Sequence, residues 1–335
     1  MKPSLKPGVQ PRRVLTALGA IAALTAVCAS APAFADPKFP DSPIRIIVPF
    51  APGGGVDRAA RVVGKQMQDH LKVAVFIDNR AGGNGAIGGK AVQIAPADGY
   101  TLLFSAATHV LAKQVMATPP YDPQADFAAV ARVGEAPLLV AITPTLPQAR
   151  LGEVISAARR EPDKWTAAIP ALGAPSHLAT LLLAKQGGFK LTTASYKGTA
   201  PASVDVAGGH AQLIVDSIIS LQPLAKGGKL KAIATTSSKR SGVMPEVPTA
   251  AESGYPGLVY ASWYGFWAPK GTPEERVRLL NKAINEAVAE VTRNGEFASL
   301  GIDAVSDSPE GFRKYVAGYV AQSAELLKEA GFKPE

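Results

Sequence analysis

Short apolar runs alternate with helical patterns along the chain, and this alternation predicts an α/β fold. In the first part of the chain, Ile44–Val48, Val73–Ile77 and Tyr100–Ser105 have the composition of buried strands. Between them, apolar residues return at helical spacing, for example over residues 86–95. Strands that alternate with helices form a mostly parallel sheet covered by helices on both faces.

A second block of the same kind begins near Leu138. Its expected strands are Leu138–Ile142, Trp165–Ile169, Ala211–Val215 and Lys231–Thr235. Its expected helices are Leu151–Arg160, Ser176–Gln186 and one that Thr199 caps and that ends at Gly208. An aromatic segment, Tyr260–Trp267, then leads to two charged amphipathic helices, about Pro273–Thr292 and Pro309–Ala330. This order predicts two lobes connected by two crossings, with residues 36–138 and 262–335 in lobe 1 and residues 139–261 in lobe 2.

A glycine-rich turn joins the first strand to the first helix. Pro52 is followed by Gly53, Gly54 and Gly55, which can adopt positive φ and let a ligand approach the backbone closely. The N–H groups at the start of a helix form a site for a carboxylate or a phosphate. Glycines that serve only the geometry of a tight turn would have the same sequence, and both interpretations remain open. Asp57 is expected to cap the helix and not to contact a ligand.

The stretch Gly83–Gly88 matches the pattern G-x-G-x-x-G, which is typical of dinucleotide sites. It follows a strand and opens a helix, as such a site requires. No acidic residue ends a strand about 20 residues further on, where a dinucleotide site needs one. Close packing of helix against strand is the preferred explanation of these glycines.

The first 35 residues have the pattern of a secretory signal peptide. Four basic residues precede the apolar run Val14–Cys28, and Ala33-Phe34-Ala35 matches the A-x-A cleavage pattern. The mature chain is therefore expected to begin at Asp36 and to be exported. Cys28, the one cysteine, would leave with the signal. Export by the Sec or by the twin-arginine route, to which Arg12-Arg13 would belong, is not decided.

The charge of the mature chain suits a small anionic ligand. The sequence has 35 Lys and Arg, four of them within residues 1–35, against 27 Asp and Glu, which leaves a net charge of +4. Such a small excess over a long chain is not the basic stripe of a nucleic-acid-binding protein.

Several motifs together resemble those of one receptor family. The chain is similar to the Bug-type extracytoplasmic solute-binding receptors of the tripartite tricarboxylate transporter (TctC-like) family over nearly its whole mature length. The motifs that carry the resemblance are Phe50–Asp57, Asp78-Asn79-Arg80, Pro96–Leu103, Tyr196–Pro201, Met244–Thr249 and Phe266–Pro269.

The resemblance implies a two-lobed periplasmic-binding-protein (Venus-flytrap) fold, type II-like, in which each lobe is a mixed, mostly parallel sheet flanked by helices. It implies a monomeric receptor that binds a small organic carboxylate and works with integral-membrane transporter subunits. It implies no catalysis, no cofactor, no metal and no nucleic acid. Whether the ligand is an amino acid, a di- or tricarboxylate or an aromatic acid is open.

The resemblance also implies the ligand-binding residues. In lobe 1 they come from two loops, and they are Gly53, Gly54, Gly55, Val56, Ser105, Ala106, Ala107, Thr108 and His109. In lobe 2 they are Gly173, Ser176, Lys197, Gly198, Thr199, Ala200 and Asp216. The chain departs from the family pattern after Thr108-His109, where it has Val110-Leu111-Ala112-Lys113 and the family often has Ala-Ile-Asn-Pro, and at Val56, where threonine is common. Both changes make the rim of the expected site less polar.

Some candidate residues have simpler explanations. His109 and His177 lie apart from other metal-ligand residue types and are expected to be structural or to line the pocket. Lys197 is expected to be structural, and Trp263 and Trp267 to lie in the core. Asp216 is left open, since a carboxylate after a strand could orient water or accept from a ligand hydroxyl or ammonium.

Two other classes of function are weighed against the transport receptor. An exported hydrolase is disfavoured, because the chain has no G-x-S-x-G, no H-E-x-x-H and no cysteine in its mature part. A receptor that presents its closed form to a membrane signalling partner has the same sequence features as a transport receptor.

Overall fold

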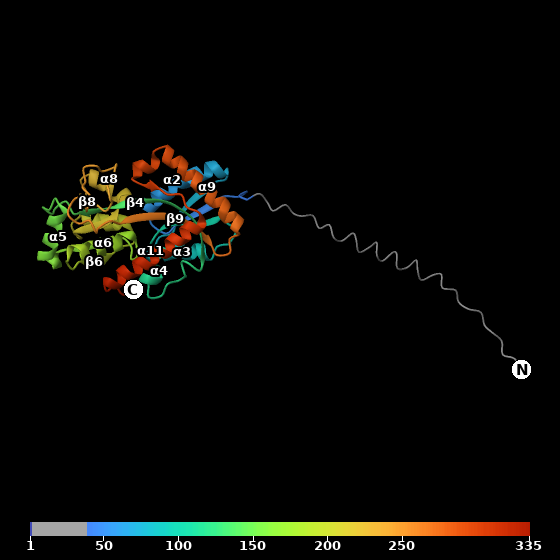
Figure 1. Ribbon diagram of the computed structural model, residues 1–335, viewed down its shortest axis with the longest axis horizontal. Helices are drawn as coiled ribbons and strands as arrows, with labels where there is room; N and C mark the ends of the chain where they lie inside the picture. Colours follow the sequence, from blue (N-terminus) through green and yellow to red (C-terminus); the bar gives the residue numbers. More distant parts are fainter. Residues whose placement is uncertain (2–38) are drawn as a thin grey trace. The chain divides into compact units, whose positions relative to one another are not determined.

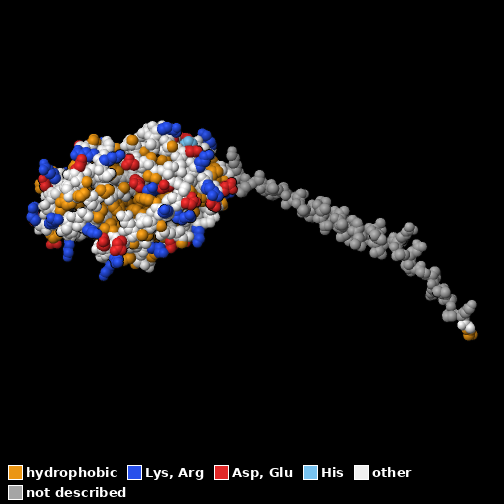
Figure 2. Space-filling model, viewed as in Figure 1, with side chains coloured by type: hydrophobic (Ala, Val, Ile, Leu, Met, Phe, Trp, Pro, Cys, Tyr) orange, Lys and Arg blue, Asp and Glu red, His pale blue; other side chains and the backbone are white. Residues whose placement is uncertain are grey.

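The computed structural model describes Met1 and residues 39–335, and the expected signal peptide and its cleavage site lie outside these described residues. Residues 42–335 form one compact unit, which holds the helices and strands named below (Figure 1). Within the described residues, no helix has the length and apolar character that crossing a membrane requires. Basic side chains are scattered over the face shown in Figure 2 and do not gather in one patch.

The unit contains two sheets that share one strand. The elements of its first part are β1 (Ile44–Val48), α2 (Gly55–Leu71), β2 (Val75–Asn79), η1 (Gly83–Gly85), α3 (Ala86–Gln93), β3 (Thr101–Ala106), α4 (Ala112–Val115) and β4 (Phe127–Ile142). Those of the middle part are α5 (Leu151–Arg160), η2 (Pro162–Lys164), β5 (Thr166–Ile169), α6 (Pro175–Gly187), β6 (Thr192–Ser195), α7 (Thr199–Ala207), β7 (Leu213–Ser217), α8 (Ile218–Lys226) and β8 (Lys231–Thr235). The last are β9 (Ala261–Pro269), α9 (Glu274–Arg293), α10 (Glu296–Leu300), β10 (Asp303–Ala304) and α11 (Pro309–Glu329).

The first sheet has three neighbouring parallel strands on one side and helices on both faces. Strand β1 pairs in parallel with β2 and β3, and β3 pairs antiparallel with β9. Successive side chains of a strand point to opposite faces. Ile46 lies next to Gly64 of α2, whereas Ile47 packs with Ala86 and Val92 of α3. Helices therefore cover both faces of this sheet, as the alternating pattern predicts.

The second sheet repeats this arrangement. Strand β5 pairs in parallel with β6 and with β7, while β7 and β8 pair antiparallel with the second part of β4. The predicted bounds of α5 and β8 are confirmed to the residue, because both segments have clear periodicity and end at turn-forming sequences.

One long strand, β4, crosses from the first sheet to the second. Strand β4 pairs with β9 from Phe127 to Pro137, which faces Ala261, and then continues into the second sheet. Thr236 lies at this junction, where its hydroxyl accepts from the Leu138 N–H at 2.9 Å and its own N–H donates to the Leu138 carbonyl at 2.9 Å. The prediction that this strand begins near Leu138 is wrong, because Gly134 and the charged Arg132 and Glu135 interrupt the apolar run before it.

The elements that the sequence analysis missed include β6 and α8. Strand β6 is short, polar and largely exposed, so its sequence lacks an apolar signal. Helix α8 contains Pro223, which reads as a helix breaker. Helix α8 matters for function because it begins directly after Asp216 and Ser217 at the end of β7.

Candidate functional site

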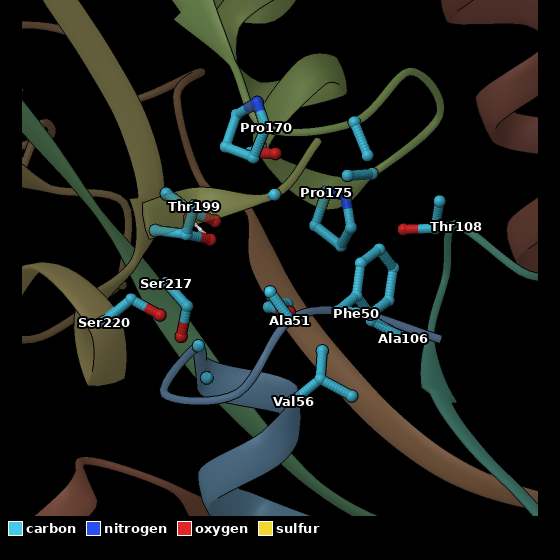
Figure 3. Close-up of a pocket in the computed structure, with 18 of the residues that line it drawn as sticks. Phe50, Ala51, Val56, Ala106, Thr108, Pro170, Pro175, Thr199, Ser217 and Ser220 are labelled. Carbon is cyan, nitrogen blue, oxygen red and sulfur yellow. Dashed lines mark hydrogen bonds between the residues drawn. The ribbon is translucent and has the colours of Figure 1, made fainter. Parts of the chain in front are cut away.

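A cavity lies where the ends of the two sheets meet, and Figure 3 shows the residues around it. It holds about 600 Å³ of atom-free space, counting its open mouth. The first sheet contributes the turn between β1 and α2, the end of β3 and part of β9. The second sheet contributes the loop between β5 and α6, the start of α7 and the junction of β7 with α8.

The glycine turn before α2 forms one wall of the cavity, with Gly54, Gly55 and Val56 lining it. Positive φ occurs only at Gly53 among the three glycines, at +88°. Gly54 is extended (φ −73°, ψ 170°) and is the N-cap residue, and Gly55 is the first helical residue. The expectation that Gly54 or Gly55 needs positive φ is therefore wrong, and glycine at these two positions has another explanation.

Asp57 stabilises this turn from the side that does not line the cavity. Its carboxylate accepts from the Gly53 N–H at 2.9 Å and from Asn79 Nδ2 at 3.0 Å, and it pairs with Arg61 at 2.9 Å. Burial alone would raise the pKa of Asp57, but the hydrogen bonds from Arg61, Gly53 and Asn79 outweigh it and lower the pKa below its ordinary value. Asp57 does not line the cavity, as predicted, although the N-cap residue is Gly54.

Four helices begin at the cavity. Residues from the first turn or the cap of each line it: Gly54 and Gly55 of α2, Pro175 and Ser176 of α6, Thr199 and Ala200 of α7, and Ser217 and Ser220 of α8. The first N–H groups of a helix have no intrahelical acceptor and carry a partial positive charge. Within the described residues, Ser176 Oγ and Ser220 Oγ are buried without a hydrogen-bond partner. The cavity therefore presents hydrogen-bond donors that the protein itself does not use.

Asp216 is the acidic group of the cavity wall. It lies in β7 and accepts from Thr199 Oγ1 at 2.5 Å. Burial raises its pKa to about 6, although hydrogen bonds from Thr199 and from the Ser217 N–H act in the opposite direction. Among the described residues that line the cavity there is no Lys, Arg or His. Thr199 is the first helical residue of α7 and not the predicted cap, which is Gly198.

Tyr264 and Ser217 add a pair of hydroxyls to the wall. Their oxygens lie 3.0 Å apart, with Tyr264 on β9 and Ser217 at the end of β7. Burial raises the pKa of Tyr264 to about 12, so its hydroxyl stays protonated and can donate.

Most of the predicted ligand-binding residues come together here. Those that line the cavity are Gly54, Gly55, Val56, Ala106, Thr108, Ser176, Gly198, Thr199, Ala200 and Asp216. Those that lie outside its lining are Gly53, Ser105, Ala107, His109, Gly173 and Lys197. Lys197 lines a neighbouring cavity of about 630 Å³ together with the turn Gly82–Gly85.

The two predicted histidines belong to the interior of the protein. His109 Nδ1 lies 3.2 Å from the Tyr121 hydroxyl and its ring packs edge-on against Phe127 and Trp267. His177 Nδ1 accepts from the Gly173 N–H at 3.2 Å. Burial lowers the pKa of His109 to about 3 and that of His177 to about 4, so both are neutral. Both residues therefore have a structural environment, and His109, a predicted ligand-binding residue, lies outside the lining of the cavity.

Other lining residues were missed by the sequence analysis. They are Phe50, Ala51, Pro52, Pro170, Ala171, Ala174, Pro175, Ser217, Ser220, Ser262 and Tyr264. Phe50–Pro52 and Pro170–Pro175 directly adjoin predicted residues, so extending each predicted loop by a few positions would have found them. Ser217 and Ser220 belong to the overlooked helix α8. Trp263 and Trp267 are buried in the core, as expected.

The described lining residues of the cavity include several hydroxyls and one carboxylate. The serine and threonine hydroxyls have no imidazole or amine base beside them among the described lining residues. No group of three or more His, Cys, Asp or Glu in the described part of the chain could hold a metal ion. In the stretch Gly83–Gly88, a Cβ at Gly88 would lie 2.7 Å from Pro49 Cβ, which confirms that close packing explains this glycine.

Comparisons with known proteins agree with this arrangement. A sequence model described as "Tripartite tricarboxylate transporter family receptor" matches residues 59–332. BugT of Bordetella pertussis (strain Tohama I) is 36% identical over 323 residues, which cover 96% of this chain and 98% of BugT. The solved periplasmic binding protein BugD has a TM-score of 0.83 and 34% identity, covering 89% of this chain and all of BugD.

Two solved structures with bound ligands are also similar. R. palustris Rpa4515 with adipate has a TM-score of 0.85 and 32% identity, covering 89% of this chain and 100% of that chain. MatC (Rpa3494) from Rhodopseudomonas palustris with bound malate has a TM-score of 0.80 and 30% identity, covering 86% of this chain and 100% of that chain. These similarities confirm the two-lobed periplasmic-binding-protein fold expected from the sequence.

Proposed function

The chain belongs to the tripartite tricarboxylate transporter receptor family, the Bug-type solute-binding receptors, and we propose that it captures a small carboxylate in this cavity and delivers it to an integral-membrane transporter. The observation that carries the proposal is the convergence of four helix N-termini and two unpartnered hydroxyls, Ser176 and Ser220, on one cavity. Backbone N–H groups and hydroxyls hold a carboxylate without a basic side chain.

The relatives support a carboxylate as the ligand class. Adipate is bound in Rpa4515 and malate in MatC, and both are small dicarboxylates. BugD is a periplasmic binding protein, which supports a periplasmic location for this chain. Cleavage after Ala35 would remove residues 1–35. The charge of +4 for the mature chain favours encounter with anions in that compartment.

The proposed mechanism is closure of two lobes around the ligand. We assign residues 36–138 and 262–335 to lobe 1 and residues 139–261 to lobe 2, with the ligand in contact with both. Such a ligand stabilises the closed state, because its contacts with both lobes exist only there. The hinge would lie where Pro137 faces Ala261 and where Thr236 bonds to Leu138.

A ligand screen tests the proposed function. Protein expressed from Asp36 is titrated calorimetrically with mono-, di- and aromatic carboxylates and with the matched primary amides of the same acids. We expect at least one carboxylate to bind and its amide to bind far more weakly, because the amide lacks the negative charge that the helix N-termini attract. Equal binding of acid and amide, or binding of no carboxylate in the panel, would count against the proposal.

Small-angle scattering tests the closure. The radius of gyration of the protein from Asp36 is measured with and without the best ligand of the screen. We expect a smaller radius in the bound state, and an unchanged radius would contradict closure while leaving carboxylate binding intact.

A further inference from the structure

Asp216 is an unusual residue for an anion-binding cavity. It is the acidic side chain among the described lining residues, it is 9% exposed, and no basic side chain lines the cavity beside it. A buried carboxylate without a cationic partner is unfavourable unless hydrogen bonds satisfy it. A ligand carboxylate in the same cavity would also be repelled by it.

The hydrogen bonds of Asp216 within the protein leave part of its capacity free. Thr199 Oγ1 and the Ser217 N–H donate to the carboxylate. An ionised carboxylate has about four acceptor positions, so further donors can be accommodated. Since Asp216 lines the cavity, a ligand is placed to supply them.

The cavity thus combines two opposite requirements. The N-termini of α2, α6, α7 and α8 attract a negative charge, whereas Asp216 attracts a hydrogen-bond donor or a positive charge. One small molecule meets both if a donor group lies close to its carboxylate.

We propose that Asp216 determines the specificity of this cavity and selects carboxylates with a neighbouring hydroxyl or ammonium group over acids that lack such a donor. This inference rests on the proposed function and narrows its ligand class to hydroxy acids and amino acids. Asp216 accepts a hydrogen bond from that donor, while the helix N-termini hold the carboxylate.

Matched ligand series test the selectivity of the wild-type protein. Calorimetric titrations at pH 7.5 compare propionate, lactate and alanine; succinate, malate and aspartate; and glutarate, 2-hydroxyglutarate and glutamate. In the series whose chain length fits best, we expect the donor-bearing acid to bind about tenfold to a hundredfold more tightly than the plain acid, as one hydrogen bond to a charged group allows. The tighter of hydroxy acid and amino acid identifies the donor.

Two variants assign the selectivity to Asp216. Asp216→Asn keeps the shape of the side chain and an acceptor for Thr199 but removes the charge. We expect this variant to prefer the donor-bearing acid over the plain acid by less than about threefold. The plain acid should bind to the variant at least as tightly as to the wild type. Asp205→Asn is the matched control, since Asp205 lies on α7, accepts from the Tyr196 hydroxyl at 2.7 Å and does not line the cavity. It should keep the wild-type preference, and thermal melts verify that both variants fold.

The outcomes separate this inference from the proposed function. If plain acids bind to the wild type as tightly as donor-bearing ones, or if Asp216→Asn keeps the preference, the inference is wrong and carboxylate binding stands. If binding of the donor-bearing acid takes up a proton that Asp216→Asn abolishes, Asp216 donates instead of accepting, which also overturns it. If no acid binds, the proposed function fails and the inference fails with it.

Discussion

Two glycine-rich turns, Pro52–Gly55 and Gly82–Gly85, have the same sequence signature of strand, glycines and helix. In the first turn, a Cβ at Gly54 would meet nothing closer than the Ala51 carbonyl at 3.9 Å, and Gly54 lines the candidate functional cavity. A Cβ at Gly55 would approach Ser217 Oγ and Ser220 Oγ, both at 3.2 Å, across the cavity wall. The space beside this turn is thus left open or bordered by hydroxyls of another helix.

The second turn lines the neighbouring cavity that includes Lys197, but the helix that follows it packs closely against the protein's own chain. Gly82 and Gly85 have φ of +126° and +88°, which side-chain-bearing residues rarely adopt. Just beyond the turn, a Cβ at Gly88 would collide with Pro49, and one at Gly89 with the ring of Tyr121. The comparison teaches that this signature predicts a turn, whereas the neighbours of the missing Cβ decide whether the glycines serve packing or a ligand.

The largest expected effect is on ligand affinity at Gly54. Gly54→Leu should weaken carboxylate binding by about two to four orders of magnitude, through loss of two hydrogen bonds of about 1.5–3 kcal/mol each. The variant should fold normally, because the backbone of Gly54 is extended and its Cβ position is free. Calorimetry and a thermal melt on one sample measure both effects. Wild-type affinity in the folded variant would show that the first turn serves geometry alone.

Gly88 should show the opposite pattern. Gly88→Leu places atoms within 2.7 Å of Pro49 Cβ and 2.8 Å of its Cα, and we expect it to lower the free energy of unfolding by about 1–3 kcal/mol. For a unit of this size the melting temperature should fall by roughly 2–10 °C. The folded fraction should bind the ligand as the wild type does. If Gly88→Leu reduced the affinity for the ligand without changing the melting temperature, the two turns would not differ in role.

Asp57 provides a further test of the comparison, because its carboxylate accepts a hydrogen bond from the Gly53 N–H and so stabilises the first turn. Asp57→Asn should cost about 1–2 kcal/mol of unfolding free energy at pH 7, since charged hydrogen bonds become neutral ones. The pKa of Asp57 is lowered in the folded state from its ordinary value of 3.8. Its contribution is therefore complete above about pH 4 and is lost as the pH falls through the folded-state pKa. Denaturant melts at pH 7 and pH 3 should show a difference between wild type and variant that shrinks in acid.

Single methyl groups in the first turn are expected to have small effects on the free energy of unfolding. Gly53→Ala should cost about 1–2 kcal/mol of unfolding free energy, because a Cβ disfavours φ of +88° even where nothing obstructs it. Ligand affinity should not change, since the Gly53 N–H already donates to Asp57. Gly54→Ala, the matched control, should stay within about 0.5 kcal/mol of the wild type. A destabilisation at Gly54 as large as that at Gly53 would contradict the assigned conformations.

Local patterns in the sequence were sufficient for many elements. The α5 helix and the β8 strand could be placed to the residue, because periodicity and turn residues act over short stretches of chain. The same patterns missed α8, whose Pro223 suggests a break, and the first part of β4, where charged residues interrupt the apolar run. In the folded protein, packing against the sheets and the pairing of β4 with β9 stabilise these segments despite their weak local signal.

The lining of the cavity could be identified only from the tertiary structure. The sequence, partly through its resemblance to a receptor family, indicated the glycine turn, the loops after β3 and β5, the start of α7 and Asp216 as candidate site elements. Only the fold decided that Gly53 alone among the three glycines has positive φ, that His109 and Lys197 lie outside the cavity, and that Ser217 and Ser220 face Gly55. The physical reason is the distance along the sequence over which the determining interactions act. A strand or a helix is encoded by neighbours in the sequence, whereas a cavity wall is made by residues that only the pairing and packing of distant elements bring together.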